Sequence, residues 1–129
     1  MELSKRLNFI INNIDKVSVL ADVGTDHGYI PLYATQNGLC HKAIAIDINK
    51  DPLDKARLNA ILEGAGDELE FRLGDGLNPL KKDEVEAVVI AGMGGNLIRD
   101  ILEENIEKVA SFNYLILVPA QNPEVLNFK

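Results

Sequence analysis

Short apolar runs alternate with amphipathic segments along the whole chain. Near the N-terminus, apolar residues recur at the spacing of an amphipathic helix; they are Leu3, Leu7, Ile10, Ile11 and Ile14. Five apolar runs predict strands at residues 17–23, 42–48, 69–73, 87–91 and 114–118. Because helical segments separate these runs, and the runs are apolar on both faces, we expect βαβ units and a parallel sheet that is covered on both sides.

Proline, glycine and capping residues mark the ends of the predicted helices. Pro31 suits the first turn of a helix that stops at Gly38. Asp51 is expected to cap the next helix, which runs through residue 62 and ends at Gly64. Asn96 is expected to cap the helix that follows the fourth strand.

The predicted fold class is α/β, a Rossmann-like doubly wound sheet that is mostly parallel. The length of 129 residues suits one domain, residues 1–129. Sheets of this kind commonly carry further strands, so we expect the chain to be truncated after its fifth strand, with the remaining strands in a missing C-terminal part. The fifth strand would then be an exposed edge that allows self-association.

Composition adds constraints on partners and compartment. The net charge of −7 argues against strong nucleic-acid binding by these residues alone, because proteins that bind phosphates usually present a basic face. A single cysteine, Cys40, permits no internal disulfide, which suits the reducing cytoplasm. The apolar runs are too short to cross a membrane, and no cluster of metal-ligating residues stands out in the sequence.

Glycines and carboxylates follow the predicted strands, at the edge where α/β sheets bind ligands. Asp47 closes the second strand, 23 positions after Gly24, where an acidic side chain typically accepts hydrogen bonds from ribose hydroxyls. Gly24 and Gly28 allow close backbone approach or a positive φ. Asp75 follows Gly74 in the third loop, within reach of an adenine amino group.

The loop after the first strand differs from a dinucleotide-binding loop. The stretch ADVGTDHGYIP, residues 21–31, has two glycines separated by three residues and carries Asp26 between them. A carboxylate there would repel a pyrophosphate, but it suits a nucleoside that carries positive charge and no phosphate. S-adenosylmethionine, with its ammonium and sulfonium groups, fits this requirement, and a nicotinamide dinucleotide is disfavoured. Asp22 either contacts this ligand or caps the loop by accepting backbone N–H groups.

Four stretches make the chain resemble the bacterial tRNA adenine-22 N1-methyltransferase family. They are LSKRL (3–7), ADVGTDHGYIP (21–31), RLGDGL (72–77) and VVIAGMGGNLIRDIL (88–102). The resemblance covers essentially the whole chain, and the combination of DHGY with IAGMGG is distinctive. It implies a class I domain that uses S-adenosylmethionine to methylate N1 of an adenine in tRNA. It also implies a C-terminal helical extension, absent here, that helps to hold the tRNA.

The resemblance also implies roles for individual residues. Asp26, His27 and Tyr29 form the candidate catalytic group: the carboxylate would stabilise the cationic N1-methyladenine product, and the two rings would hydrogen-bond to or stack on the target base. The loop residues and the resemblance together give the candidate cofactor-binding set. Its members are Asp22, Gly24, Gly28, Asp47, Gly74, Asp75, Gly92, Met93 and Gly94.

Structural alternatives stay open for these positions. Asp26 could cap a helix, His27 could be an ordinary loop histidine, and Tyr29 could belong to the core. Lys5 and Arg6 could contact RNA or simply form the exposed face of the first helix. The alternative functions are a methyltransferase that acts on another nucleic acid or a small molecule, and a non-catalytic nucleoside-binding or interaction module.

Overall fold

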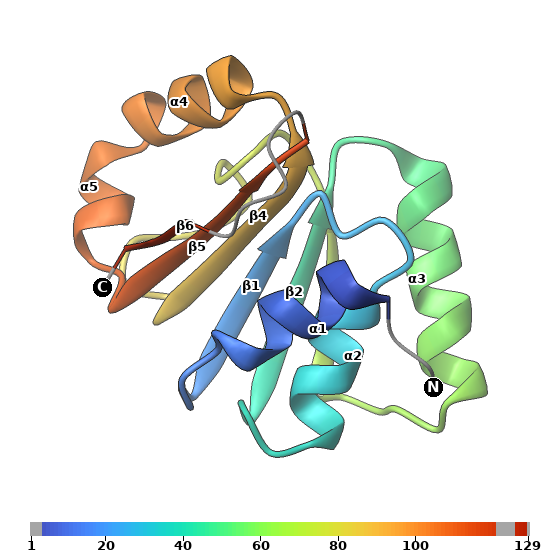
Figure 1. Cartoon of the computed structure of the whole chain (residues 1–129). Coiled ribbons are helices and arrows are strands. Elements are labelled where there is room, and N and C mark those ends of the chain that lie inside the picture. Colours follow the sequence, from blue (N-terminus) through green and yellow to red (C-terminus); the bar gives the residue numbers. More distant parts are fainter. Residues whose placement is uncertain (1–3, 121–125, 129) are drawn as a thin grey trace.

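The computed structural model describes residues 4–120 and 126–128, which form a single α/β unit (Figure 1). Its helices are α1 (Lys5–Asn12), α2 (Tyr29–Gln36), α3 (Lys50–Leu62), α4 (Gly95–Glu104) and α5 (Ile106–Ala110). Its strands are β1 (Val19–Val23), β2 (Lys42–Asp47), β3 (Leu69–Leu73), β4 (Ala87–Met93), β5 (Tyr114–Pro119) and β6 (Leu126–Phe128). None of the helices in this part of the chain is both long enough and apolar enough to cross a membrane.

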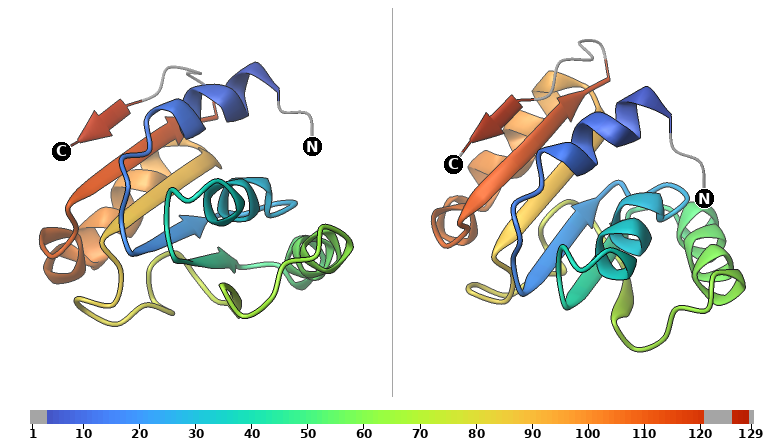
Figure 2. Two further views of the ribbon diagram at one scale, coloured as in Figure 1. Left: turned by 90° about the horizontal axis from the view of Figure 1, so that it is seen from below. Right: turned by 60° about the horizontal axis from the view of Figure 1, so that its bottom comes forward.

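The strands form one sheet in the order β3-β2-β1-β4-β5-β6, in which the first five run parallel. Helices α1, α2 and α3 lie on one face of the sheet, and α4 and α5 lie on the other (Figures 1 and 2). Each face has its own apolar core: Leu20 packs with the first group of helices, whereas Ala21 and Val23 pack with α4. The predicted Rossmann-like fold class is therefore confirmed.

The sheet does not end at the fifth strand, which corrects one sequence prediction. The short strand β6 pairs antiparallel with residues 115–117 of β5. The edge of β5 is therefore occupied along this stretch, and β5 is not the exposed edge that the sequence predicted. The sequence offered little signal for β6, because three residues are too few to show a period.

Strand β4 is longer than predicted and includes Gly92 and Met93, which were expected in a loop. Pairing with β5 continues as far as Met93 opposite Pro119, after a register shift between Ala91 and Met93. Gly92 lies at this irregularity with a φ of +78°, a backbone conformation that favours glycine. The irregularity allows the strand to continue to the ligand-binding edge while its backbone bends.

Two predicted helix caps are also wrong. Helix α3 begins two residues earlier than expected, with Asn49 as its N-cap, and Asp51 lies in the first turn. A carboxylate in that position still interacts favourably with the helix dipole. Helix α4 has Gly94 as its N-cap, because β4 ends at residue 93 and leaves a single connecting residue. Asn96 is therefore already inside the helix.

Gly28 and Gly38 allow a matched test of how closely α2 packs on α3. Both glycines have a φ near +73°, at +74° and +72°. A Cβ on Gly28 would lie 2.8 Å from the Cβ of Ala56 in α3, whereas a Cβ on Gly38 would meet nothing within 4 Å. Gly28 therefore permits a close contact between backbone and helix that Gly38 does not make.

We predict that Gly38→Ala lowers the free energy of unfolding by about 1 kcal/mol, through backbone strain alone. Gly28→Ala should lower it by about 1–3 kcal/mol more, because the added methyl group also clashes with α3. Urea denaturation of both variants measures the difference. Equal losses would show that α2 can move away from α3 without cost.

Candidate functional site

Two adjoining cavities open at the carboxyl ends of the parallel strands. The larger has a volume of about 470 Å³ and the smaller about 100 Å³. They share lining residues from three strand ends and from α4, namely Gly24, Asp47, Ile48, Met93 and Leu97. Helix α1 forms one wall of the larger cavity through Arg6, Leu7 and Ile10. The larger volume lies within the range that small-molecule ligands occupy.

Asp22 lines the larger cavity and is only 1% exposed. Neither of its carboxylate oxygens has a hydrogen-bond partner at bonding geometry among the described residues, and the same holds for the hydroxyl of Thr25 beside it. Buried polar groups in native proteins are almost always hydrogen-bonded. Two unpartnered groups against one cavity therefore indicate a site for a ligand that supplies hydrogen-bond donors.

Burial raises the pKa of Asp22 to about 7. The Thr25 hydroxyl and, more weakly, the Arg6 guanidinium oppose this rise, whereas the nearby charges of Asp47 and Asp26 add to it. A positively charged ligand group in the cavity would favour the ionised form of Asp22 and so lower its pKa. The electrostatics of the cavity floor therefore favour a ligand with a cationic group.

Asp47 lines both cavities and also organises the backbone around it. Its Oδ1 accepts a hydrogen bond from the N–H of Asn49 at 2.9 Å, which fixes the start of α3. Its Oδ2 lies 3.5 Å from the backbone N of Asp26, a long contact that draws the loop after β1 toward the end of β2. Asp47 therefore has two local backbone partners in addition to its place at both cavities.

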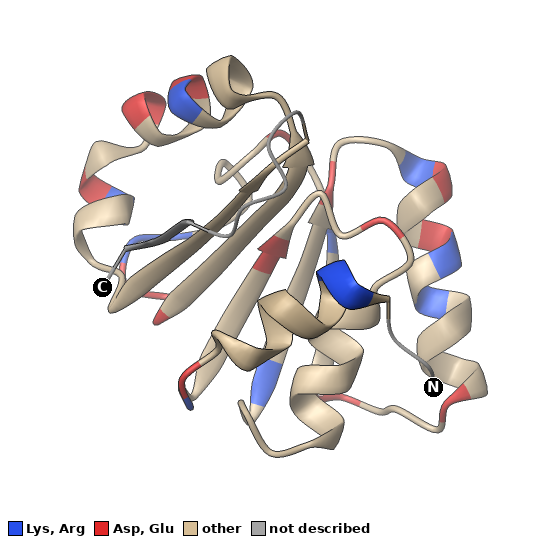
Figure 3. Cartoon of the chain, viewed as in Figure 1, with Lys and Arg blue, Asp and Glu red and all other residues tan. Residues whose placement is uncertain are grey.

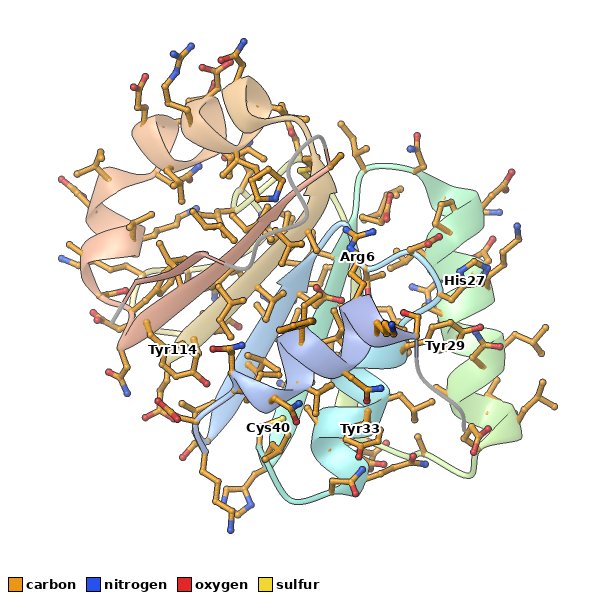
Figure 4. All side chains as sticks on the ribbon, viewed as in Figure 1. Arg6, His27, Tyr29, Tyr33, Cys40 and Tyr114 are labelled. Atoms are coloured by element: carbon orange, nitrogen blue, oxygen red, sulfur yellow. The ribbon has the colours of Figure 1, made fainter. Side chains whose placement is uncertain are left out.

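Asp26, His27 and Tyr29 are exposed or half-buried beside the larger cavity. Asp26 has a φ of +55° and a side chain that is 75% exposed, and it lines the cavity. Its Oδ1 lies 3.2 Å from Nδ1 of His27. The His27 ring stacks on Tyr29, with centroids 5.4 Å apart and an interplanar angle of 10° (Figure 4). Left-handed backbone at a non-glycine residue is uncommon and concentrates at functional sites.

The structure brings together most of the predicted site residues. The larger cavity is lined by Asp22, Gly24, Asp26, Asp47, Gly92 and Met93, and the smaller adds Gly74 and Asp75. The predicted residues that line neither cavity are Gly28, His27, Tyr29 and Gly94. His27 and Tyr29 adjoin Asp26 at the rim, whereas Gly28 faces α3.

Sequence reasoning assigned no cofactor-binding role to several residues that line the larger cavity. Thr25 and Ile48 each lie next to a predicted residue, so their position could have been noticed. Arg6 and Leu97 gave no such signal, because only the packing of α1 and α4 brings them to the strand ends.

Because the carboxylate of Asp22 is buried, we predict that removing it raises the free energy of unfolding, by an amount that depends on pH. The folded-state pKa of Asp22 lies above its ordinary value of 3.8, so the folded protein binds more protons and loses stability as the pH rises from about 4 to about 7. Asp22→Asn removes that loss. We expect the variant to be more stable than the original protein at pH 8, by a few kcal/mol on the scale of about 1.4 kcal/mol per pKa unit.

Urea unfolding at pH 8, 6 and 4.5 measures this effect, and the gain should shrink toward pH 4.5. Asp67→Asn is the matched control, because it makes the same chemical change on an exposed residue. A gain for Asp22→Asn that does not depend on pH would contradict the burial of an ionised carboxylate.

Comparisons with known proteins agree with this architecture. A family model described as a methyltransferase domain matches residues 3–128. The tRNA (adenine(22)-N(1))-methyltransferase of Bacillus subtilis is 41% identical over 119 residues, which cover 92% of this chain and 50% of that protein. The chain thus spans about half the length of the curated relative it matches.

Solved structures give the same result. The Streptococcus pneumoniae protein Sp1610 in complex with S-adenosyl-L-methionine is 37% identical, with a TM-score of 0.86 over 92% of this chain and 56% of that one. TrmK of M. capricolum in complex with S-adenosyl-homocysteine is 34% identical, with a TM-score of 0.81 over 91% of this chain and 52% of that one. Together with the family match, these likenesses show that the chain belongs to the methyltransferase domain family.

Proposed function

We propose that residues 1–129 are the cofactor-binding domain of an enzyme that uses S-adenosylmethionine to methylate N1 of adenine 22 in tRNA. The observation that carries the proposal is the buried, unpartnered carboxylate of Asp22 in a cavity at the strand ends. The 41% identity to the B. subtilis enzyme supports the choice of substrate. Such an enzyme would act in the bacterial cytoplasm, where tRNA is modified.

The cavity residues suit the parts of this cofactor. S-adenosylmethionine supplies a methyl group activated by its positively charged sulfur. Asp22 and Thr25 would hold the ammonium group, since neither side chain has a hydrogen-bond partner at bonding geometry in residues 4–120 and 126–128. Asp47 would accept hydrogen bonds from the ribose hydroxyls, and Asp75 in the smaller cavity would bind the adenine amino group. The complexes of Sp1610 with S-adenosyl-L-methionine and of M. capricolum TrmK with S-adenosyl-homocysteine support the choice of cofactor.

Asp26, His27 and Tyr29 would position the target adenine at the rim of the larger cavity. Adenine N1 has a free lone pair at neutral pH, so methyl transfer needs no strong base and depends mainly on positioning. The stacked rings of His27 and Tyr29 offer a flat surface for a base that has left its stack. The exposed carboxylate of Asp26 would stabilise the positive charge that develops on the methylated base.

Firm tRNA binding would need residues beyond this chain. The 129 residues carry a net charge of −7, whereas affinity for nucleic acids depends on neutralising phosphates. The relative that it matches is about twice as long. We therefore assign cofactor binding to this domain, and most of the tRNA affinity to the rest of the complete protein.

Isothermal titration calorimetry tests the cofactor assignment. We expect S-adenosylmethionine to bind at one site per chain and NAD not to bind. Asp47→Asn should weaken S-adenosylmethionine binding by about 10- to 100-fold, because an amide replaces the charged acceptor. This substitution preserves Oδ1 for the N–H of Asn49, so the start of α3 should survive. Asp67→Asn is the control, and equal affinities for it and Asp47→Asn would contradict the ribose assignment.

The reaction itself is tested on the complete protein with unmodified tRNA. We expect 1-methyladenosine at position 22, detected by mass spectrometry and by primer extension, as the name of the B. subtilis relative suggests. A tRNA with another base at position 22 should not be methylated. Methylation at a different position, or of a small molecule only, would overturn the substrate assignment.

A further inference from the structure

Arg6 lies over the carboxyl end of β4 although it belongs to the N-terminal helix. It lines the larger cavity together with Leu7 and Ile10 of the same helix. Its Nη2 lies 3.3 Å from the point that a Cβ on Gly92 would occupy. Figure 4 shows the Arg6 side chain above the end of β1, between α1 and the loop that carries His27. The absence of a side chain at residue 92 therefore leaves room for the guanidinium at the cavity.

Acidic side chains outnumber basic ones among the described residues that line the larger cavity. Its lining residues include the carboxylates of Asp22, Asp26 and Asp47, and Arg6 is the one cation among those described. Figure 3 shows the positive end of α1 beside the acidic end of β1. Arg6 forms no ion pair with any residue in the described ranges 4–120 and 126–128, and its charge partly opposes the rise in the pKa of Asp22. The guanidinium is therefore close enough to influence the carboxylate of Asp22, but it forms no ion pair with the carboxylates that line the cavity.

The proposed cofactor carries a matching set of charges at its methionine end. An ammonium group and a sulfonium suit the three carboxylates, but the α-carboxylate would be repelled by them. A carboxylate in this cavity therefore needs a cation, and a guanidinium binds carboxylates through two parallel N–H groups. Arg6 is the described residue that meets this need.

We propose that Arg6 is a cofactor-binding residue that recognises the α-carboxylate of S-adenosylmethionine. The proposal rests on the proposed function and assigns a role to α1, which closes one wall of the cavity and supplies its cation. It also separates Arg6 from its neighbour Lys5, which does not line the cavity. Contact with RNA, the alternative suggested by the sequence, would not require the guanidinium to lie at the strand ends.

The test removes the two proposed partners separately. Calorimetry would measure the Kd of S-adenosylmethionine and of decarboxylated S-adenosylmethionine, which keeps the ammonium and sulfonium groups but lacks the carboxylate. We expect Arg6→Ala to raise the Kd of S-adenosylmethionine about tenfold, and to leave the Kd of the decarboxylated compound unchanged. Arg6→Lys should retain part of the affinity, and Lys5→Ala, the control, should change neither value. Circular dichroism would check that each variant folds.

Three results would overturn the inference. Equal weakening of both ligands by Arg6→Ala would mean that Arg6 shapes the cavity without binding the carboxylate. Unchanged affinity for S-adenosylmethionine, with a loss of tRNA binding by the complete protein, would assign Arg6 to RNA. Failure of the original protein to bind S-adenosylmethionine would overturn the proposed function as well, and this is established before any variant is compared.

Discussion

The candidate site depends on the pairing of β1 in parallel on both sides, with β2 and with β4. Parallel pairing brings the carboxyl ends of the strands to one edge, and each return connection must cross a face of the sheet. The ends of β1 and β2, which carry Asp22 and Asp47, and the loop after β3, which carries Asp75, are far apart in sequence and therefore meet around two adjoining cavities. Both neighbours of β1 pair with its backbone as far as Val23, and the side chain of Asp22 beside that end is only 1% exposed.

Burial of Asp22 is the energetic consequence of that position. Its carboxylate has no hydrogen-bond partner at bonding geometry in the part of the chain that the structure describes, so it destabilises the folded state whenever it is ionised, as its raised pKa reflects. A ligand that supplies a positive group and hydrogen-bond donors removes much of this penalty. The same arrangement thus lowers the stability of the protein alone and strengthens the binding of a cationic nucleoside.

Helix α1 completes the cavity from the other end of the chain. Leu7 and Ile10 pack toward the sheet, and this packing positions Arg6 against the glycine at residue 92 of β4. The glycine at the irregularity of β4 leaves space beside the strand. The packing of α1 places the guanidinium of Arg6 in that space. Lys5, one residue away, points to a different side of the helix and has no such role.

The sequence by itself determined the alternation of strands and helices, the Rossmann-like class and the carboxylates at the strand ends, because these follow from local periodicity and from parallel topology. It also identified Asp22, Asp26 and Asp47, which all line the larger cavity. Only the tertiary structure decided that β4 continues through Gly92, that β6 pairs with β5, and that Arg6 faces the cavity. Those outcomes depend on contacts between segments distant in sequence, and no local pattern of residues encodes them.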